Sequence, residues 1–262
     1  MSHSTMYLND NITAYKTILI KEILRFSRIW LQTIIPPAIT MGLYFIIFGQ
    51  LIGSQLSNID GYTYMDYIVP GLIIMSIITN SYSNVVSSFY GSKFHHHIEE
   101  LLVSPIANIT IIAGYISGGI ARGLTVGIIV TLVSLFFTQI SIASYITAFV
   151  VAILTATLFS LAGLINAIFA NSFDDISIVP TFILTPLTYL GGVFYSIEML
   201  PEFWRNISLF NPVLYMVNGF RMGMLGVSDA SLATAIMIII GFIVLLTSIC
   251  LWLLNSGIGI KK

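Results

Sequence analysis

Few residues in this chain combine a reactive side chain with a spacing that supports chemistry. Three consecutive histidines, residues 95–97, precede Glu99 and Glu100, and Asp174 stands next to Asp175. Neighbouring residues on a helix do not face one direction, and no cysteine lies near the histidines, so a solvated loop is favoured there over a metal site. Two adjacent carboxylates without other oxygen ligands also make a weak metal site. We expect the aspartates to stabilise a helix N-terminus, and we expect no metal or cofactor in this chain.

An enzymatic role would need a convergent nucleophile and base, or a metal cluster. The single cysteine, Cys250, stands in an apolar run, and no Ser/His/Asp arrangement can be argued from the sequence. The chain also lacks the G-x-x-x-x-G-K-[ST] loop that cradles nucleotide phosphates. An intramembrane enzyme is therefore disfavoured, and we do not expect the chain to hydrolyse ATP by itself.

The composition is that of an integral membrane protein. Of the 262 residues, 57% are hydrophobic and 8% are charged, whereas soluble domains carry about 25% charged residues. The 10 basic and 11 acidic residues contain no basic run. Nucleic acid is therefore not an expected partner, while membrane lipids are.

Six apolar segments are close to the length of about 20 residues that crosses about 30 Å of hydrocarbon as a helix. They are residues 30–51, 65–89, 109–137, 144–170, 176–197 and 230–254. The predicted fold is an all-α polytopic membrane protein, with one transmembrane domain over residues 1–262. Residues 1–30 form a tail and an amphipathic helix, residues 90–108 form a cytoplasmic loop, and residues 198–229 form a periplasmic segment.

The distribution of lysine and arginine predicts the orientation. Seven basic residues lie before the first span, in the 90–108 loop or at the C-terminus, and two, Arg205 and Arg221, lie in the 198–229 segment. Because cytoplasmic segments carry the excess of Lys and Arg, both termini are expected in the cytoplasm.

The segment from residue 12 to residue 30 has helical periodicity. Its apolar stripe consists of Ile12, Tyr15, Leu19, Ile23, Phe26 and Trp30. Lys21, Arg25 and Arg28 fall on the opposite face. Such a helix would lie along the membrane surface with its cations toward phosphates. The alternative is that it extends the first span.

The predicted fifth span is broken by Pro180, Pro186, Gly191 and Gly192. Broken backbone at membrane depth must line a cavity or be covered by protein. Beyond it, two short helical patterns meet at Asn211-Pro212, which suggests a re-entrant hairpin dipping from the periplasm.

We expect the broken segment and hairpin to form the outer gate of a transport path. The gate candidates are Tyr189, Phe194, Tyr215 and Phe220, with Glu198, Glu202, Arg205 and Arg221 near the water. The commoner role of such aromatic side chains is anchoring at the membrane interface.

Arg122 lies about midway along the third predicted span. A cation near the bilayer centre costs about 2.5–3.5 kcal/mol on insertion scales, so its environment must compensate. Arg122 either pairs inside the bundle with an acidic side chain or a backbone carbonyl, or faces a water-filled translocation path and attracts an anionic headgroup. The sequence leaves both alternatives open.

Several short blocks, taken in order, resemble the permease subunit of type-2 ATP-binding-cassette (ABC) exporters. The blocks are VPGLI (69–73), LLVSPI (101–106) after a glutamate-rich turn, FDDIS (173–177), PLTYLGGVFYS (186–196) and NPVLYMVNGFR (211–221). The resemblance implies a six-span subunit in the bacterial inner membrane. In that family the subunit pairs with a second, identical copy as a homodimer, and the dimer binds two copies of a separate ATPase that holds ATP and magnesium.

By this resemblance, the segment from Phe94 to Pro105 is the coupling helix. The coupling residues would be Phe94, His95, Glu99, Glu100, Leu101, Leu102 and Pro105. The amphipathic N-terminal segment resembles the family's connector helix. The exported substrate would be an amphipathic drug, lipid or glycan-like molecule.

A secondary transporter is the competing class, since a broken helix and a charge at membrane depth suit it as well. Internal inverted symmetry would favour it, and none is detected in the sequence.

Overall fold

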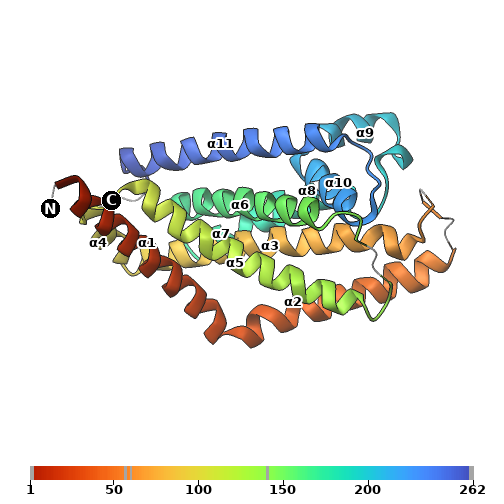
Figure 1. Cartoon of the computed structure of the whole chain (residues 1–262), viewed down its shortest axis with the longest axis horizontal. Coiled ribbons are helices and arrows are strands. Elements are labelled where there is room, and N and C mark those ends of the chain that lie inside the picture. The colour runs from red at the N-terminus through yellow and green to blue at the C-terminus, as the bar shows by residue number, and fades with distance from the viewer. Residues whose placement is uncertain (1–2, 56–57, 60, 140–141, 260–262) are drawn as a thin grey trace.

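The computed structural model describes residues 3–55, 58–59, 61–139 and 142–259, and the regular structure of these residues is helical. Five helices are long and apolar enough to cross a membrane. They are α2 with its π-helical continuation η1 (Trp30–Tyr44 and Phe45–Ile52), α3 (Tyr64–Phe94), α5 (Asn108–Ser134), α6 (Tyr145–Phe169) and α11 (Leu232–Ser256). They run along the long axis of the molecule (Figure 1). The predicted spans at these places coincide with these helices to within a few residues, except that α3 extends into the predicted 90–108 loop.

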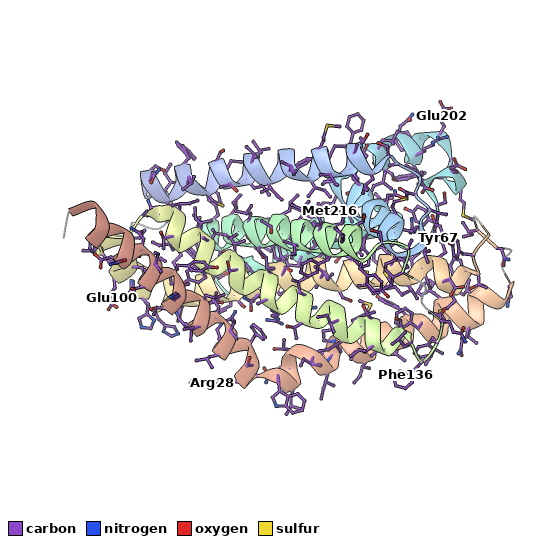
Figure 2. The ribbon with its side chains drawn as sticks, in the orientation of Figure 1. Arg28, Tyr67, Glu100, Phe136, Glu202 and Met216 are labelled. Atoms are coloured by element: carbon purple, nitrogen blue, oxygen red, sulfur yellow. The ribbon has the colours of Figure 1, made fainter. Side chains whose placement is uncertain are left out.

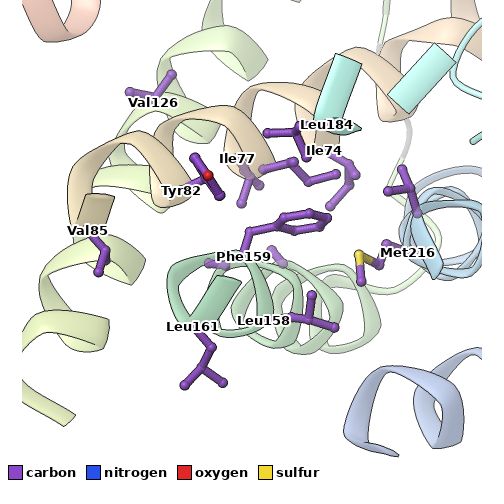
Figure 3. Packing of buried hydrophobic residues seen from close by; sticks show 14 of the residues in the cluster. Ile74, Ile77, Tyr82, Val85, Val126, Leu158, Phe159, Leu161, Leu184 and Met216 are labelled. Carbon is purple, nitrogen blue, oxygen red and sulfur yellow. The ribbon is translucent and has the colours of Figure 1, made fainter. Parts of the chain in front are cut away.

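The central element is α3, which packs against α5 on one side and α6 on the other. In the interior, Ile74 and Ile77 of α3 lie beside Phe159 of α6 (Figure 3). Glycines allow the helix backbones to approach: a Cβ atom on Gly163 of α6 would stand 2.7 Å from the carbonyl oxygen of Tyr82 on α3. In a membrane, where apolar side chains gain little by leaving lipid, such close packing holds helices together.

The predicted span 176–197 is not one helix of spanning length, which corrects the prediction of six continuous spans. It contains α7 (Asp175–Val179), the π-helical η3 (Pro180–Leu184) and α8 (Thr185–Tyr189), which together make fifteen residues. At 1.5 Å per residue the helix is about 22 Å long, short of the hydrocarbon thickness of about 30 Å. Each proline removes an N–H donor inside the helix, and Gly192, at φ 72°, turns the chain after it.

The predicted pair of short helices beyond this segment is confirmed. A short 3-10 turn, η4 (Ile197–Met199), leads to α9 (Glu202–Leu209), and α10 (Pro212–Leu225) follows. The side chain of Asn211 caps α10 by accepting from the Val213 N–H, and it donates to the Leu187 carbonyl at 2.6 Å. This amide therefore ties the hairpin turn to α8. Whereas α9 is largely exposed, α10 packs against α6, α11 and α3.

The opposite end of the molecule holds α1 (His3–Arg28), α4 (His97–Val103) and the end of α11 (Figure 1). The chain bends at Ile29 between α1 and α2, so α1 does not simply extend the first span. Ile12, Ile23 and Trp30 of the predicted stripe are exposed, while α1 packs on α5. Arg25 differs from its predicted outward position, because its side chain reaches the backbone carbonyl of Asn84 on α3 at 2.9 Å.

Candidate functional site

At its end near α1, α3 continues through a tight turn into the short helix α4. The turn needs His96 in the left-handed region, at φ 61°, and the His96 Nδ1 atom lies 2.8 Å from Glu99 Oε1. Ile98 is 1% exposed and fastens α4 to the bundle. The carboxylates of Glu99 and Glu100 point away from it and are exposed. This end of the molecule therefore presents a rigidly attached, acidic surface.

The structure brings all seven predicted coupling residues together at this place. Phe94, His95, Glu99, Glu100 and Pro105 are exposed, while Leu101 and Leu102 are half-buried and pack against the core. We call the exposed five the docking surface. Within the described part of the chain, no group of His, Cys, Asp and Glu side chains could hold a metal ion.

The turn between α6 and α7 is fixed to the last turns of α3, beside the docking surface, which the sequence did not predict. Lys93 Nζ donates to the carbonyls of Ile168 and Ala170 at 2.7 Å each, at the end of α6. The ring of Phe173 packs edge-on against Tyr90, with centroids 4.9 Å apart. The only sequence signal was a lysine in the predicted 90–108 loop, which carries no information about the helix that it contacts.

The two aspartates after α6 stand at the start of α7, as predicted, but neither carboxylate accepts from an N–H group of that helix. Asp174 is the N-terminal cap residue of α7, and the carboxylate of Asp175 accepts from the backbone N–H groups of Asn171 (2.9 Å) and Ser172 (3.1 Å). These hydrogen bonds, the one from Asn171 first, stabilise the charged form and lower the pKa of Asp175.

At the other end, two of the four predicted gate aromatics meet. The rings of Tyr189 and Phe194 stack with centroids 5.7 Å apart, and Phe194 also contacts Tyr44 and Phe48 of the first span. The Tyr44 and Tyr189 hydroxyls lie 3.5 Å apart. The partners from the first span were missed, because nothing in a run of apolar residues marks which side chains meet a helix so distant in sequence.

The other two predicted gate aromatics lie apart from this cluster. Phe220 is buried in the core, and the Tyr215 hydroxyl donates to the Leu209 carbonyl within the hairpin, at 2.9 Å. The structure therefore does not unite the four residues in one gate.

Arg221, predicted to stand near water, is 1% exposed, so that prediction was wrong. Its guanidinium carbon lies 3.9 Å from the centre of the Tyr67 ring on α3, and Nη2 donates to the Gly192 carbonyl at 2.7 Å. A charged side chain can be buried only where polar and aromatic groups replace its hydration. These contacts of Arg221 connect three elements: α10 of the hairpin, the turn that follows α8, and α3.

Arg122 is half-buried on α5, and its Nη2 atom lies 3.4 Å from Asn80 Oδ1 on α3. Among the described residues it forms no ion pair with a carboxylate. In the described part of the chain Arg122 pairs with neither an acidic side chain nor a backbone carbonyl, and its hydrogen bond to a neutral amide inside the bundle does not balance the charge. Both alternatives therefore stay predictions.

A polar network missed from the sequence lies beside Arg122. Glu22 on α1 is 0% exposed, and its carboxylate accepts from Arg25 (3.2 Å), Asn84 (3.3 Å) and the Ser88 hydroxyl. The available signal was Glu22 itself, a carboxylate four residues after the buried Ile18 and therefore on the same helical face.

The described chain is a bundle of helices long and apolar enough to cross a membrane. The predicted coupling residues lie at one end, the broken helix and the pair of short helices lie at the other, and Arg122 lies between them. The model of the ABC-2 type transporter family matches residues 13–225. The chain belongs to this family, as a non-catalytic membrane permease subunit of the inner membrane.

The comparison with curated proteins identifies a similar permease. The chain is 57% identical over 249 residues to the inner membrane transport permease YadH of Escherichia coli K12, covering 95% of this chain and 97% of the relative. The YadH protein of Shigella flexneri shows the same identity and coverage. The nodulation protein J of Rhizobium leguminosarum bv. viciae is 21% identical over 203 residues, covering 77% of this chain and 78% of that protein.

Proposed function

We propose that this permease forms the translocation path of an exporter, as a homodimer that binds two copies of a separate ABC ATPase at its docking surfaces. ATP and magnesium bind to the ATPase, which fits a permease chain without a phosphate-binding loop. In this arrangement both termini and α4 face the cytoplasm, and the hairpin faces the periplasm. The broken helix α7–η3–α8, together with the turn after it, makes the sixth, incomplete crossing.

The observation that carries the proposal is the attachment of α4 to α3. The docking surface lies at one end of a 31-residue helix that is buried for most of its length and packs on α5 and α6. A push on α4 therefore moves the core of the subunit rather than a loose loop. Closure of the ATPase pair would rock the two permease copies and alternately open a cavity between them.

Two exposed surfaces, one on the broken helix and one on α3, could face the transport cavity or the second copy of the permease. Ile178, Phe182 and Ile183 on the broken helix are exposed, and so is Thr79 on α3. At membrane depth, a broken helix or an exposed polar group is tolerated where protein covers it or where it lines a water-filled cavity. The aromatic cluster of Tyr189 with its neighbours then closes the path toward the periplasm.

The proposed substrate class rests on the side chains of this lining. Aromatic and aliphatic side chains near a few polar groups suit an amphipathic drug, lipid or glycan-like molecule. One relative carries a name that refers to nodulation and not to a chemical class, so the class rests on the lining.

The docking role is tested by reversing the charge of Glu99 and Glu100. The double variant Glu99→Lys/Glu100→Lys should lower copurification of the cognate ATPase, because like or mispaired charges across an interface weaken association. The matched control is Glu198→Lys/Glu202→Lys, which makes the same change at the opposite end of the molecule; Figure 2 shows Glu100 and Glu202 at the two ends.

ATPase activity of the reconstituted complex gives a second readout. The control variant should keep both copurification and coupled activity. Unchanged copurification and activity in the Glu99/Glu100 variant would refute the docking role, and the failure of any ATPase to copurify with the unmodified permease would refute the proposed function itself.

A further inference from the structure

Three cations from α1 and α5 meet one polar face of α3 at successive depths. Lys21 Nζ lies 3.4 Å from Ser92 Oγ, Arg25 Nη2 lies 2.8 Å from Asn84 Oδ1, and Arg122 Nη2 lies 3.4 Å from Asn80 Oδ1. We call Lys21, Arg25 and Arg122 the cation ladder. Its contacts on α3 extend over twelve residues, about 18 Å, from the end near the docking surface toward the middle of the span.

The ladder carries more positive charge than its surroundings balance. Glu22 forms an ion pair with Arg25 at 3.2 Å, while Lys21 and Arg122 form none among the described residues. Three positive charges and one carboxylate leave a net charge of +2. The acceptors of Arg25 and Arg122, Asn84 and Asn80, stand about one helical turn apart on α3, so the two like charges repel each other at short range. An anion placed between them would relieve this repulsion.

The ladder also has hydrogen-bonding capacity to spare. The Nε–H groups of Arg25 and Arg122 are buried, and neither has a hydrogen-bond partner in the described part of the chain. Buried donors without partners cost free energy, and an anion that accepts hydrogen bonds from these two groups would recover it. Guanidinium groups are suited to phosphate and carboxylate, which they can bind through two parallel hydrogen bonds.

An apolar surface lies next to Lys21 and Arg25 of the cation ladder. An open groove of about 620 Å³ on α1 is lined by the cations Lys21, Arg25 and Arg28 and by the apolar side chains Ile20, Leu24 and Ile29. The three apolar side chains are exposed. A molecule with an anionic head and a hydrocarbon tail matches this combination better than a free inorganic anion does.

We propose that the cation ladder binds the phosphate or carboxylate headgroup of an anionic amphiphile and leads it from the cytoplasmic surface toward the middle of the membrane. The proposal rests on the proposed export function, since it names the substrate class of that path. Lys21 receives the headgroup near the surface, and Arg25 and Arg122 hold it at depth, while the hydrocarbon tail stays on the apolar side of the groove.

The test is photolabelling of the full-length permease in phosphatidylcholine nanodiscs, without ATPase, by a diazirine-bearing alkyl phosphate. Dodecyl phosphate should compete with the probe at concentrations at least about tenfold lower than dodecyl maltoside or inorganic phosphate, because a charged hydrogen bond contributes roughly this much to affinity. The neutral detergent tests the head charge, and inorganic phosphate tests the need for a tail.

Variants assign the labelling to the ladder. Arg122→Gln should reduce labelling about tenfold, whereas Arg122→Lys, which keeps the charge, should retain most of it. Arg205→Gln, an identical change at an exposed position of α9, is the matched control and should label normally. If Arg122→Gln does not fold, Lys21→Gln at the exposed end of the ladder replaces it and should also reduce labelling.

Three results would overturn the ladder: equal competition by dodecyl maltoside, equal competition by inorganic phosphate, or full labelling of a folded Arg122→Gln or Lys21→Gln variant. Because labelling is measured without ATPase, it separates the two proposals. Loss of ladder specificity with intact ATPase copurification refutes only the ladder, while specific labelling without any ATPase partner refutes only the proposed export function.

Discussion

Gly71 of α3 lies where this helix meets the turn after the broken segment. A Cβ atom on Gly71 would stand 2.5 Å from the carbonyl oxygen of Val193 and 2.9 Å from its Cα atom. Both are backbone atoms, which cannot swing aside as a flexible side chain can. The change Gly71→Ala therefore has to push α3 and the turn apart.

The size of the effect follows from two opposing terms. Overpacking of a close contact costs about 1–3 kcal/mol, and the replacement of glycine by alanine inside a helix returns up to about 1 kcal/mol. We expect a net destabilisation of about 1–2 kcal/mol for Gly71→Ala. Gly91 on the same helix is the matched control, because a Cβ atom there would meet nothing within 4 Å. The Gly91→Ala variant should keep or slightly raise the stability.

The assay is thermal unfolding of both variants in one detergent, with hydrogen exchange of residues 190–196 as the local readout. Gly71→Ala should melt earlier than the unmodified chain and exchange faster in this turn, whereas Gly91→Ala should do neither. A Gly71→Ala protein that melts no earlier than the unmodified chain, with unchanged exchange in the turn, would show that α3 and the turn do not make the close contact on which this reasoning depends.

Two further substitutions test the polar contacts at the two ends of the helix bundle. Arg221→Gln should lower the melting temperature by an amount equivalent to about 3 kcal/mol, because it removes the charged hydrogen bond to Gly192 and the contact with the Tyr67 ring. Equal melting temperatures of the variant and the unmodified chain would contradict this prediction. Lys93→Met should destabilise the end of α6 by about 1 kcal/mol, because the Ala170 carbonyl loses its donor, and faster hydrogen exchange of residues 170–174 with unchanged exchange in α9 would confirm the local effect.

The long helices were predictable because their signal is local and strong. A run of about 20 apolar residues must become a helix in a membrane, since its backbone groups find no other partners there. The same rule failed over residues 176–197, where composition still suggests a span. In this segment, the length of the continuous helix depends on how Pro180 and Pro186 act on the backbone and on the turn at Gly192. Hydropathy does not report these effects.

The charged residues were harder to place, because their environment is set by helices distant in sequence. Arg221 stands in a segment expected outside the membrane, and only the fold brings Tyr67 close enough to bury it. Periodicity placed Arg25 on the polar face of α1, and that face turned out to meet the polar side chains of α3. A helical pattern shows which residues share a face, and it does not show whether that face meets water, lipid or another polar helix.

The position of α3 suggests why the polar contacts were built on this helix. Its two ends touch the docking surface and the Arg221 contact, and the cation ladder borders the region between them. A displacement at α4 that tilts α3 would change the distances from Asn84 and Asn80 to the two ladder arginines, which belong to other helices. Apolar contacts change gradually with such a tilt, whereas a hydrogen bond between charged and amide groups weakens steeply with distance and angle. Headgroup affinity at the ladder would therefore respond to the position of α4. Under the proposed function, movement of the ATPase would switch the ladder between a state that binds the anionic head and a state that releases it.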